Sequence, residues 1–501
     1  YEIASCLVGS EMCIRDSDWI TLMGSGINDM GEWPAKRRLY NMLSRLMVRN
    51  RAKDVEHECP LPPLERRIVS LSMSSLECMT YNVLQLLIML NAALSQEKDK
   101  DYYFHTGNKK TLASVMENVA MACFHFAGFE FLRQVQRAHD HILQQLNKPH
   151  GVAEQFKQEA VEALYQISAA LQDQTWREHV QQGDVLYKAE HPEERLLLSW
   201  SRRGSIWLTS EELLFLRNEY YKKSAHVLDA RGLFEELLRC GAQYKHRKTG
   251  CTVSSATHRS PKTISTPKRN EPFLSEPSRV PALPAAFDDV LVHTSTSTKL
   301  NGILQEILEA VPGEKVLVFS TLHQVLNEIA KALELCRVPF LIYVSGMPQH
   351  LRNTYVNAFT HESQFRCLLM STAIGGSGLD LHCASRIILT EPIWQWDLES
   401  QAVKRAWRIG QTRRVLVSTY VMRHTYEERV IERKKARFLN GTDAAEQLQT
   451  LTDDPGMREF LARPHLVQAP SKKREITWTR PLLGDPAKLS FVHASKRARH
   501  T

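Results

Sequence analysis

The stretch 401–411, QAVKRAWRIGQ, carries two arginines three positions apart, Arg405 and Arg408. At this spacing we predict that both lie on one face of a helix. A guanidinium group is a planar fork of N–H donors that matches phosphate oxygens. Two such groups can therefore reach a bound polyphosphate and stabilise the charge that develops in phosphoryl transfer. The alternative interpretation is a solvated basic helix face that ends at Gly410.

A glycine-rich segment lies upstream, at 371–381, with the sequence STAIGGSGLDL. It follows the apolar run 367–370, which is typical of a buried strand. Glycines after a strand allow positive φ and close approach of the backbone, so main-chain N–H groups and hydroxyls can face a phosphate. A tight strand-to-helix turn is the alternative interpretation. The candidate residues of this segment are Ser371, Thr372, Gly375, Gly376, Gly378 and Asp380.

Three further apolar runs predict buried strands, at 315–320, 340–344 and 386–390. Continuous apolar strands are typical of parallel sheets, which are covered by helices on both faces. The order of strand, glycine-rich loop, strand and arginine helix therefore predicts a parallel α/β sheet with functional residues at the ends of its strands.

These segments resemble, in the same order, motifs of the Swi/Snf-type DNA-translocating ATPases. The pattern Q-x-x-x-R-x-x-R-I-G-Q resembles the sixth motif, 371–381 resembles the fifth, and 315–320 resembles the fourth. The resemblance runs through residues 295–437. It implies an α/β fold with a RecA-like second helicase lobe, a parallel sheet with helices on both faces. The end of a first lobe and a large helical insertion would precede that lobe.

The resemblance also implies roles for individual residues. Arg405 and Arg408 are implied to be catalytic, with Arg408 as the arginine finger. ATP is the implied cofactor with Mg²⁺ held by a first lobe, and we expect no metal site in this chain. The residues implied to contact nucleotide are Gln401, Gly375, Gly376, Gly378 and Asp380. The residues implied to contact DNA are Ser371, Thr372, Ser345, Gly346 and Arg352. Asp380 stands where the family usually has asparagine, which places a negative charge near the expected phosphate.

Two motifs of a nucleotide-binding lobe are missing from the 501 residues, the P-loop G-x-x-x-x-G-K-[ST] and the box Asp-Glu-x-His. A P-loop would cradle the phosphates and an acidic box would hold Mg²⁺. Residues 46–63 resemble the stretch that closes the first lobe, and the chain starts at Tyr1 without an initiator methionine. We therefore expect a fragment that begins late in the first lobe and does not hydrolyse ATP alone.

The sequence divides into six segments. Residues 5–17 resemble adapter-derived peptide, so they are set apart from fold reasoning. Apolar spacing predicts one helix over 111–147 and more over 210–239. The expected segments are a non-native leader at 1–17, the end of the first RecA-like lobe at 18–98, a helical insertion at 99–240, a basic Ser/Thr/Pro-rich linker at 241–290, the second RecA-like lobe at 291–440 and a basic tail at 441–501.

Composition points to a polyanionic partner. The net charge is +8 with a pI near 8.9, which favours nucleic acid. With the resemblance, we expect duplex DNA, chromatin or nucleosomes, and the first lobe of the same protein as partners. Basic clusters at 472–474 and 496–499 are candidate nuclear import signals, so we expect a nuclear protein. Ten cysteines form no C-x-x-C pair, and no apolar run approaches 18 residues, so we expect neither a zinc module nor a membrane partner.

Two other functions stay open at this point. One is a non-catalytic scaffold that binds DNA or chromatin without turnover, which the missing P-loop favours if the chain is complete. The other is an RNA helicase of the wider superfamily. The ending Arg-Ile-Gly-Gln and the long insertion favour the DNA-translocating branch.

Overall fold

The computed structural model describes most of the chain from residue 60 onward. The described residues are 41, 44, 45, 60–94, 103, 108–148, 157–224, 226, 229–249, 289–372, 379–439, 451–463, 465–469 and 476–483. The chain divides into two compact units, Tyr1–Leu61 and Pro62–Thr501, and every element named below belongs to the second. The features that lie outside the described residues are the expected leader at 1–17, Gly375, Gly376, Gly378, most of the linker at 241–290 and both basic clusters of the tail.

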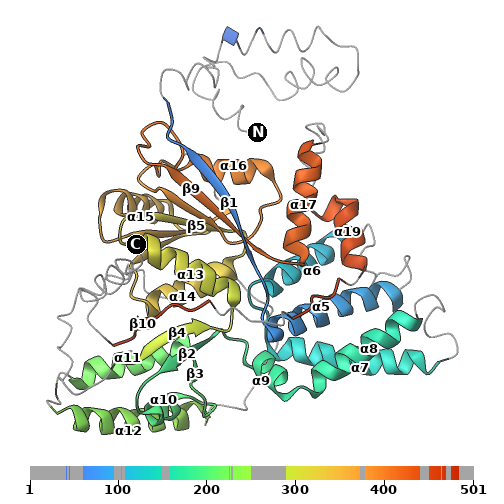
Figure 1. Cartoon of the computed structure of the whole chain (residues 1–501), viewed down its shortest axis with the longest axis horizontal. Coiled ribbons are helices and arrows are strands. Elements are labelled where there is room, and N and C mark those ends of the chain that lie inside the picture. Colours follow the sequence, from blue (N-terminus) through green and yellow to red (C-terminus); the bar gives the residue numbers. More distant parts are fainter. Residues whose placement is uncertain are drawn as a thin grey trace, which may run out of the picture. The chain divides into compact units, whose positions relative to one another are not determined.

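Six parallel strands form the central sheet (Figure 1). Five of them are β5 (Val316–Ser320), β6 (Phe340–Tyr343), β7 (Cys367–Ser371), β8 (Arg386–Leu389) and β9 (Val415–Met422). The strand order is β1-β9-β8-β5-β7-β6. Every residue of β5 and β7 is buried, as expected for parallel strands covered on both faces. The predicted parallel α/β sheet is confirmed.

Two pairs of helices cover the two faces of this sheet. The first pair is α13 (Thr298–Ala310) and α14 (His323–Leu335), and the second pair is α15 (Gln349–His361) and α16 (Trp396–Lys404). Val316 and Val318 of β5 share a core with the first pair. Leu317 and Phe319 point to the opposite face and share a core with Phe359 of α15 and with the apolar side of α16. The alternation along β5 therefore assigns α15 and α16, which lead to and from the motifs, to one face.

One strand of the sheet comes from a segment that we assigned to the end of the first lobe. Strand β1 (Leu64–Leu71) runs parallel to β9, with Leu64 opposite Val415 and Leu71 opposite Met422. Figure 1 shows the two strands side by side. The placement within residues 18–98 therefore needs correction, because this strand completes the sheet of the second lobe. The pairing satisfies backbone groups that β9 would otherwise expose at an edge.

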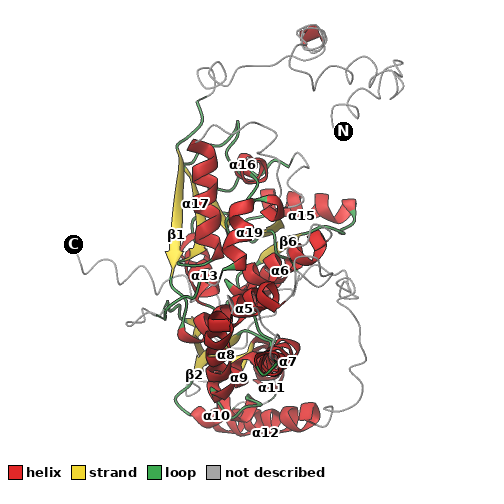
Figure 2. Ribbon diagram, turned by 90° about the vertical axis from the view of Figure 1, so that its right-hand side faces the viewer, coloured by secondary structure: helices red, strands yellow, loops and turns green. Residues whose placement is uncertain are grey.

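A helical body packs beside the sheet around a second core. Its members are α5 (Ser75–Leu94), α6 (Lys109–Ala122), α7 (Phe129–Leu146), α8 (Lys157–Gln172), α9 (Gln174–Gln182), α17 (Tyr426–Leu439) and α19 (Pro455–Ala462). Figure 2 shows α7, α8 and α9 gathered together in this body. The single helix predicted over 111–147 is wrong, because the chain leaves the helix after Ala122 and re-enters it at Phe129. Trp176 is fully buried and donates to Thr80 Oγ1 at 3.0 Å, which fixes α9 against α5.

The expected helical insertion also contributes strands to a second sheet. This sheet is antiparallel with the order β10-β4-β2-β3. Its strands are β2 (Leu186–Glu190), β3 (Trp207–Thr209), β4 (Leu291–Ser295) and β10 (Arg480–Pro481), and the helices beside them are α10 (Glu194–Trp200), α11 (Ser210–Ser224) and α12 (Ala230–Thr249). Because β2 pairs with β4, the insertion and the start of the second lobe share one sheet. The strands are short and irregular, with a register shift between Lys188 and Ala189. The sequence therefore contains no periodic pattern that predicts them.

A buried polar junction joins the helical body to α13. Lys299 and Glu427 form an ion pair in which each side chain is 1% exposed. Glu77 of α5 accepts hydrogen bonds from Thr298 N at 2.8 Å and from its hydroxyl at 2.6 Å. Ser297 caps α13 and donates to Phe124 O at 2.6 Å. Buried charges and hydroxyls need such partners, so these contacts fix the relative position of the two parts of this unit.

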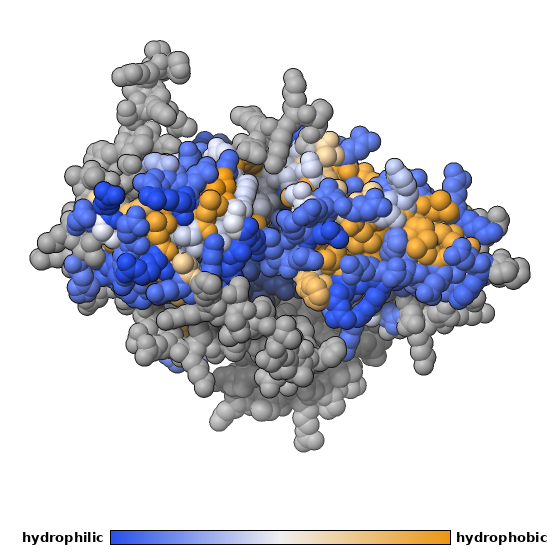
Figure 3. All heavy atoms as spheres, turned by 90° about the horizontal axis from the view of Figure 1, so that it is seen from below, coloured by the Kyte–Doolittle hydropathy of each residue, from blue (hydrophilic) through white to orange (hydrophobic). Residues whose placement is uncertain are grey.

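The lower face of the molecule is mixed in character. Seen from below, apolar patches lie among polar side chains (Figure 3). Val161 and Tyr165, one turn apart on α8, are 54% and 71% exposed. Scattered exposed apolar side chains of this kind are ordinary on a protein surface.

Candidate nucleotide and nucleic-acid interface

The two arginines of the stretch 401–411 lie beyond the end of the helix rather than on it. Helix α16 ends at Lys404, and Arg405 is its C-cap, with its N–H directed at Ala402 O and Val403 O. Arg408 follows in a turn that closes with a hydrogen bond from Gln411 N to Arg408 O at 3.0 Å. The prediction of one helical face for both arginines is therefore wrong. Only two residues separate them, so both lie in the same short segment directly after α16.

Gln411 fixes this turn from inside. It is 8% exposed, and its Nε2 donates to His382 O at 2.9 Å, Ala384 O at 2.8 Å and Ala406 O at 3.1 Å. Leu381 N donates to Arg405 O at 3.0 Å. The segment after the glycine-rich loop and the arginine turn are thus one hydrogen-bonded structure. A backbone held this way keeps its geometry when a ligand arrives, so the arginine side chains start from a fixed position.

The local electrostatics centre on Arg408 and Asp380. Arg408 Nε lies 3.7 Å from Asp380 Oδ1, and Arg408 Nη1 donates to Leu379 O at 3.5 Å. Partial burial raises the pKa of Asp380, but hydrogen bonds from His382 and the charge of Arg408 outweigh this and hold it below its ordinary value. For Arg405, burial lowers the pKa most, followed by the charge of Arg408. The arginines therefore form a positive site with one neighbouring carboxylate.

The remaining nucleotide candidates are only partly described. Gln401 is half-buried on α16, one turn before Arg405, as the predicted spacing requires. Gly375, Gly376 and Gly378 lie outside the described residues, so their proposed contact with nucleotide stays a prediction.

The DNA candidates gather at the carboxyl ends of β6 and β7. These strands are neighbours, with Tyr343 opposite Met370. Ser345 and Gly346 follow β6 and are exposed, and Gly346 has φ +88°, which favours glycine. The Arg352 guanidinium lies over the Tyr343 ring, 5.9 Å from its centroid. The structure therefore brings these predicted residues to one edge of the sheet.

Ser371 and Thr372 sit deeper than the sequence suggests. Their exposed fractions are 1% and 3%, and Thr372 Oγ1 donates to Ser320 O at 3.5 Å. Among the described residues, neither Ser371 Oγ nor Arg352 Nε has a hydrogen-bond partner, although both atoms are buried. A buried polar atom without a partner lowers the stability of the folded chain. Both atoms are therefore suited to hydrogen-bond with a ligand or a water molecule at this edge, Arg352 Nε as a donor.

Comparisons with known proteins bear on the domain that carries these residues. Residues 298–410 match the family model described as "Helicase conserved C-terminal domain". The chain is 33% identical over 172 residues to the DNA repair protein rad8 of Schizosaccharomyces pombe, covering 33% of this chain and 15% of that protein. The chain carries a helicase C-terminal domain of the Swi/Snf type. The α/β fold is the RecA-like second lobe that the motifs imply.

Other relatives match this Swi/Snf-type lobe over similar lengths. The DNA repair protein RAD5 of Gibberella zeae is 37% identical over 127 residues, covering 25% of this chain and 11% of that protein. Among solved structures, the C-terminal part of the Fun30 ATPase domain covers 80% of this chain and 97% of that chain, at 17% identity and a TM-score of 0.40. The chain thus spans only a small part of the curated relatives it matches.

The sequence interpretation of this Swi/Snf-type lobe missed one residue at the strand ends, Glu391. In the sequence it directly follows the predicted strand 386–390. In the structure it is 7% exposed and accepts hydrogen bonds from Ser320 and Thr321, about 70 positions earlier. The available signal was a carboxylate directly after a buried parallel strand, where such sheets place functional residues.

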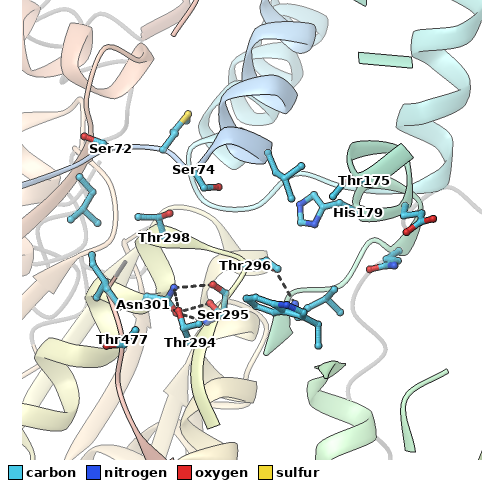
Figure 4. A pocket seen from close by; sticks show the side chains of 18 of the residues that line it. Ser72, Ser74, Thr175, His179, Thr294, Ser295, Thr296, Thr298, Asn301 and Thr477 are labelled. Carbon is cyan, nitrogen blue, oxygen red and sulfur yellow. Dashed lines mark hydrogen bonds between the residues drawn. The ribbon is translucent and has the colours of Figure 1, made fainter. Parts of the chain in front are cut away.

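The large cavity of the described residues does not belong to this interface. It has a volume of about 1260 Å³ and lies beyond the ends of β1 and β9 (Figure 4). None of the predicted site residues lines it. Figure 4 shows Asn301 pointing at Thr294 and Ser295, and these side chains bond one another at 2.8 and 2.9 Å. These polar side chains of the cavity wall therefore hydrogen-bond with one another at the start of α13.

Two further observations concern metal binding and membrane crossing. Within the described part of the chain, no group of three or more His, Cys, Asp or Glu side chains is arranged to hold a metal ion. Among those same residues, no helix has both the length and the apolar character that a membrane crossing requires.

Proposed function

We propose that this chain is the second motor lobe of an ATP-dependent DNA translocase that remodels DNA–protein complexes. Relatives named DNA repair proteins and ATP-dependent helicases support this class of activity. The feature that carries the proposal is the hydrogen-bonded turn that holds Arg405 and Arg408 directly after α16. Two arginines on a preorganised turn suit phosphate oxygens presented by a facing lobe.

The arginines complete the nucleotide site in this proposal. A facing first lobe would hold ATP together with Mg²⁺. ATP would supply the phosphoryl bond to be broken. Arg408 exchanges Asp380 for phosphate oxygens and stabilises the charge of the transition state, as arginine fingers do. Arg405 adds a second cation, and Gln401 orients the end of α16. Asp380 holds Arg408 until nucleotide binds, and His382 holds Asp380 through the same carboxylate oxygen.

Duplex DNA binds the edge formed by the carboxyl ends of β6 and β7 in this proposal. Arg352 pairs with a backbone phosphate, and the exposed Ser345–Gly346 turn approaches the strand closely. The net charge of +8 adds sequence-independent attraction. A nuclear protein that acts on chromatin or nucleosomes follows from this class of activity and forms part of the proposal.

Binding of duplex DNA by the purified chain tests the DNA part of the proposal. Fluorescence anisotropy with a labelled duplex should show binding that weakens as salt rises, and Arg352→Ala should reduce the salt slope by about one unit. Arg137→Ala on α7, whose side chain is 63% exposed in the helical body, is the matched control and should leave the slope unchanged. Tighter binding to single-stranded RNA than to duplex DNA would instead support an RNA helicase.

ATP turnover separates a motor from a scaffold. In the natural protein that contains this chain, duplex DNA should stimulate ATP hydrolysis. DNA binding without any turnover in that protein would contradict the motor and support a non-catalytic scaffold.

A further inference from the structure

Glu391 lies two residues after the end of β8, and its carboxylate turns back toward the neighbouring strand β5. It accepts hydrogen bonds from the Ser320 hydroxyl at 3.0 and 3.1 Å. It also accepts from Thr321, through the backbone N–H at 2.5 Å and the hydroxyl at 2.7 Å. The Thr390 hydroxyl donates to the same group. One carboxylate therefore ties the carboxyl end of β8 to the carboxyl end of β5.

Neutral donors alone hold this carboxylate. Among the ion pairs of the described residues, none includes Glu391, although it is 7% exposed. A buried carboxylate stays in place only when its oxygens are fully hydrogen-bonded. The arrangement also serves α14, whose N-cap Leu322 has no capping side chain. A carboxylate that accepts from Thr321 N lies close to the amino end of that helix, where a negative charge suits the helix dipole.

The same network reaches the other two strand ends that carry DNA candidates. Thr372, after β7, donates its hydroxyl to Ser320 O at 3.5 Å. Ser345, after β6, lies 3.3 Å from Nε2 of His323, the first residue of α14. The carboxyl ends of β5, β6, β7 and β8 are therefore joined through the turn 320–323 that Glu391 holds.

On its other side Glu391 leads into the arginine turn. Four residues separate it from α16, which runs directly to Arg405. Lys434 of α17 holds this connection by donating to Ile393 O and to Glu399 Oε2, both at 2.5 Å. The segment between Glu391 and α16 and the helix itself are therefore held by the same lysine.

We propose that Glu391 is a positioning residue that couples DNA at the strand-end edge to the placement of Arg405 and Arg408. This inference rests on the proposed function, because it requires DNA to bind that edge. DNA that moves the turn 320–323 moves the carboxylate, and the carboxylate moves the start of the segment that carries the arginines. Glutamine at this position keeps the shape but replaces one acceptor oxygen by a donor, so the donors around it lose a partner.

Hydrogen exchange on the purified chain tests the coupling without ATP. Saturating duplex DNA should slow amide exchange across 396–411 by about threefold or more in the wild-type chain. In Glu391→Gln we expect this slowing to disappear, while the Kd for DNA changes by less than about threefold. Glu314→Gln is the matched control, because Glu314 joins the amino ends of the same two strands through Ser385 and Arg386. It should retain the full effect of DNA on 396–411.

Each outcome decides a separate point. If Glu391→Gln shows the wild-type slowing across 396–411, or if it loses DNA binding while still folded, the coupling role is overturned. If the wild-type chain does not bind duplex DNA, the proposed function itself fails. If Glu391→Gln does not fold, Thr321→Val removes one donor to the same carboxylate and should reduce the slowing, whereas Thr321→Ser should restore it. Wild-type slowing in Thr321→Val would then overturn the proposal.

Discussion

Arg408 Nε lies 3.7 Å from Asp380 Oδ1, and Nδ1 of His382 lies 2.8 Å from the same oxygen. The two side chains of the ion pair are 41% and 49% exposed, so water screens their attraction strongly. Exposed pairs of this kind contribute on the order of 0.2–1 kcal/mol. Arg408 is therefore held in position by a contact weak enough to be exchanged for a phosphate group.

Loss of the Arg408 guanidinium should stop the motor without releasing DNA. We expect Arg408→Ala, in the natural protein that contains this chain, to lower the DNA-stimulated kcat by about 10³-fold or more. The Kd for duplex DNA should change by less than about twofold, since the residue is assigned to nucleotide. Arg414→Ala, whose side chain is 61% exposed and pairs with Glu65, is the control. A near-normal kcat in Arg408→Ala would contradict its role.

Removal of the neighbouring negative charge should favour nucleotide. We expect Asp380→Asn to lower the KM for ATP by about two- to fivefold, because it frees Arg408 and removes a charge that repels phosphate. A change of this size corresponds to the free energy of an exposed ion pair. Steady-state ATPase assays at saturating DNA measure this change. Asp397→Asn, an exposed carboxylate in the first turn of α16, should leave the KM unchanged. A higher KM in Asp380→Asn would show that this carboxylate helps to bind ATP.

The buried pair Lys299–Glu427 should be essential for stability. Replacing Lys299 by methionine leaves the Glu427 charge buried without its cation, which costs about 3–5 kcal/mol in comparable cases. Urea unfolding of the chain measures the loss. The double variant Lys299→Met with Glu427→Leu should recover part of it, because no charge is then left unpaired. Lys331→Met, at a pair in which the lysine is 42% exposed, should cost less than about 1 kcal/mol.

The carboxyl group of Glu427 should also make the free energy of unfolding depend on pH. Burial raises the pKa of Glu427 to about 7, and the charge of Lys299 only partly opposes this rise. The unfolded chain releases this proton near the ordinary glutamate value, so between the two values the folded chain binds more protons. This contribution to stability is present at low pH and is lost as the pH rises through about 7.

A comparison of wild type with Glu427→Gln isolates that contribution. The free energy of unfolding of the wild type, minus that of the variant, should fall between pH 5 and pH 7 and level off above. Urea titrations at several pH values measure this difference. A difference that stays constant or rises with pH would show that Glu427 is ionised throughout.

The sheet and the order of its motifs could be predicted because their signals are local. The run 367–370 and the central residues of 315–320 and 386–390 are apolar, and a strand covered on both faces needs no more than that. Ser345, Gly346 and Arg352 lie near one edge of the sheet in the structure, because the carboxyl ends of neighbouring parallel strands meet there. The chemical roles of these residues stay predictions.

The end of α16 could not be predicted, because nothing within 401–411 stops a helix before Gly410. The helix ends early since Gln411 and Arg405 O bond to residues 381–384, which lie in a different segment. Burial of Ser371 and Thr372 was equally hidden, because it depends on the neighbouring strand β5.

The sequence by itself determined the parallel sheet and the arginine and glycine motifs that follow its strands, since periodicity and motif spacing act over a few residues. Only the tertiary structure decided that β1 joins β9 from about 350 positions away, that Lys299 meets Glu427, and that Glu391 gathers its donors from the end of β5. These contacts arise because edge strands and buried charges take whichever partners the folded chain brings to them.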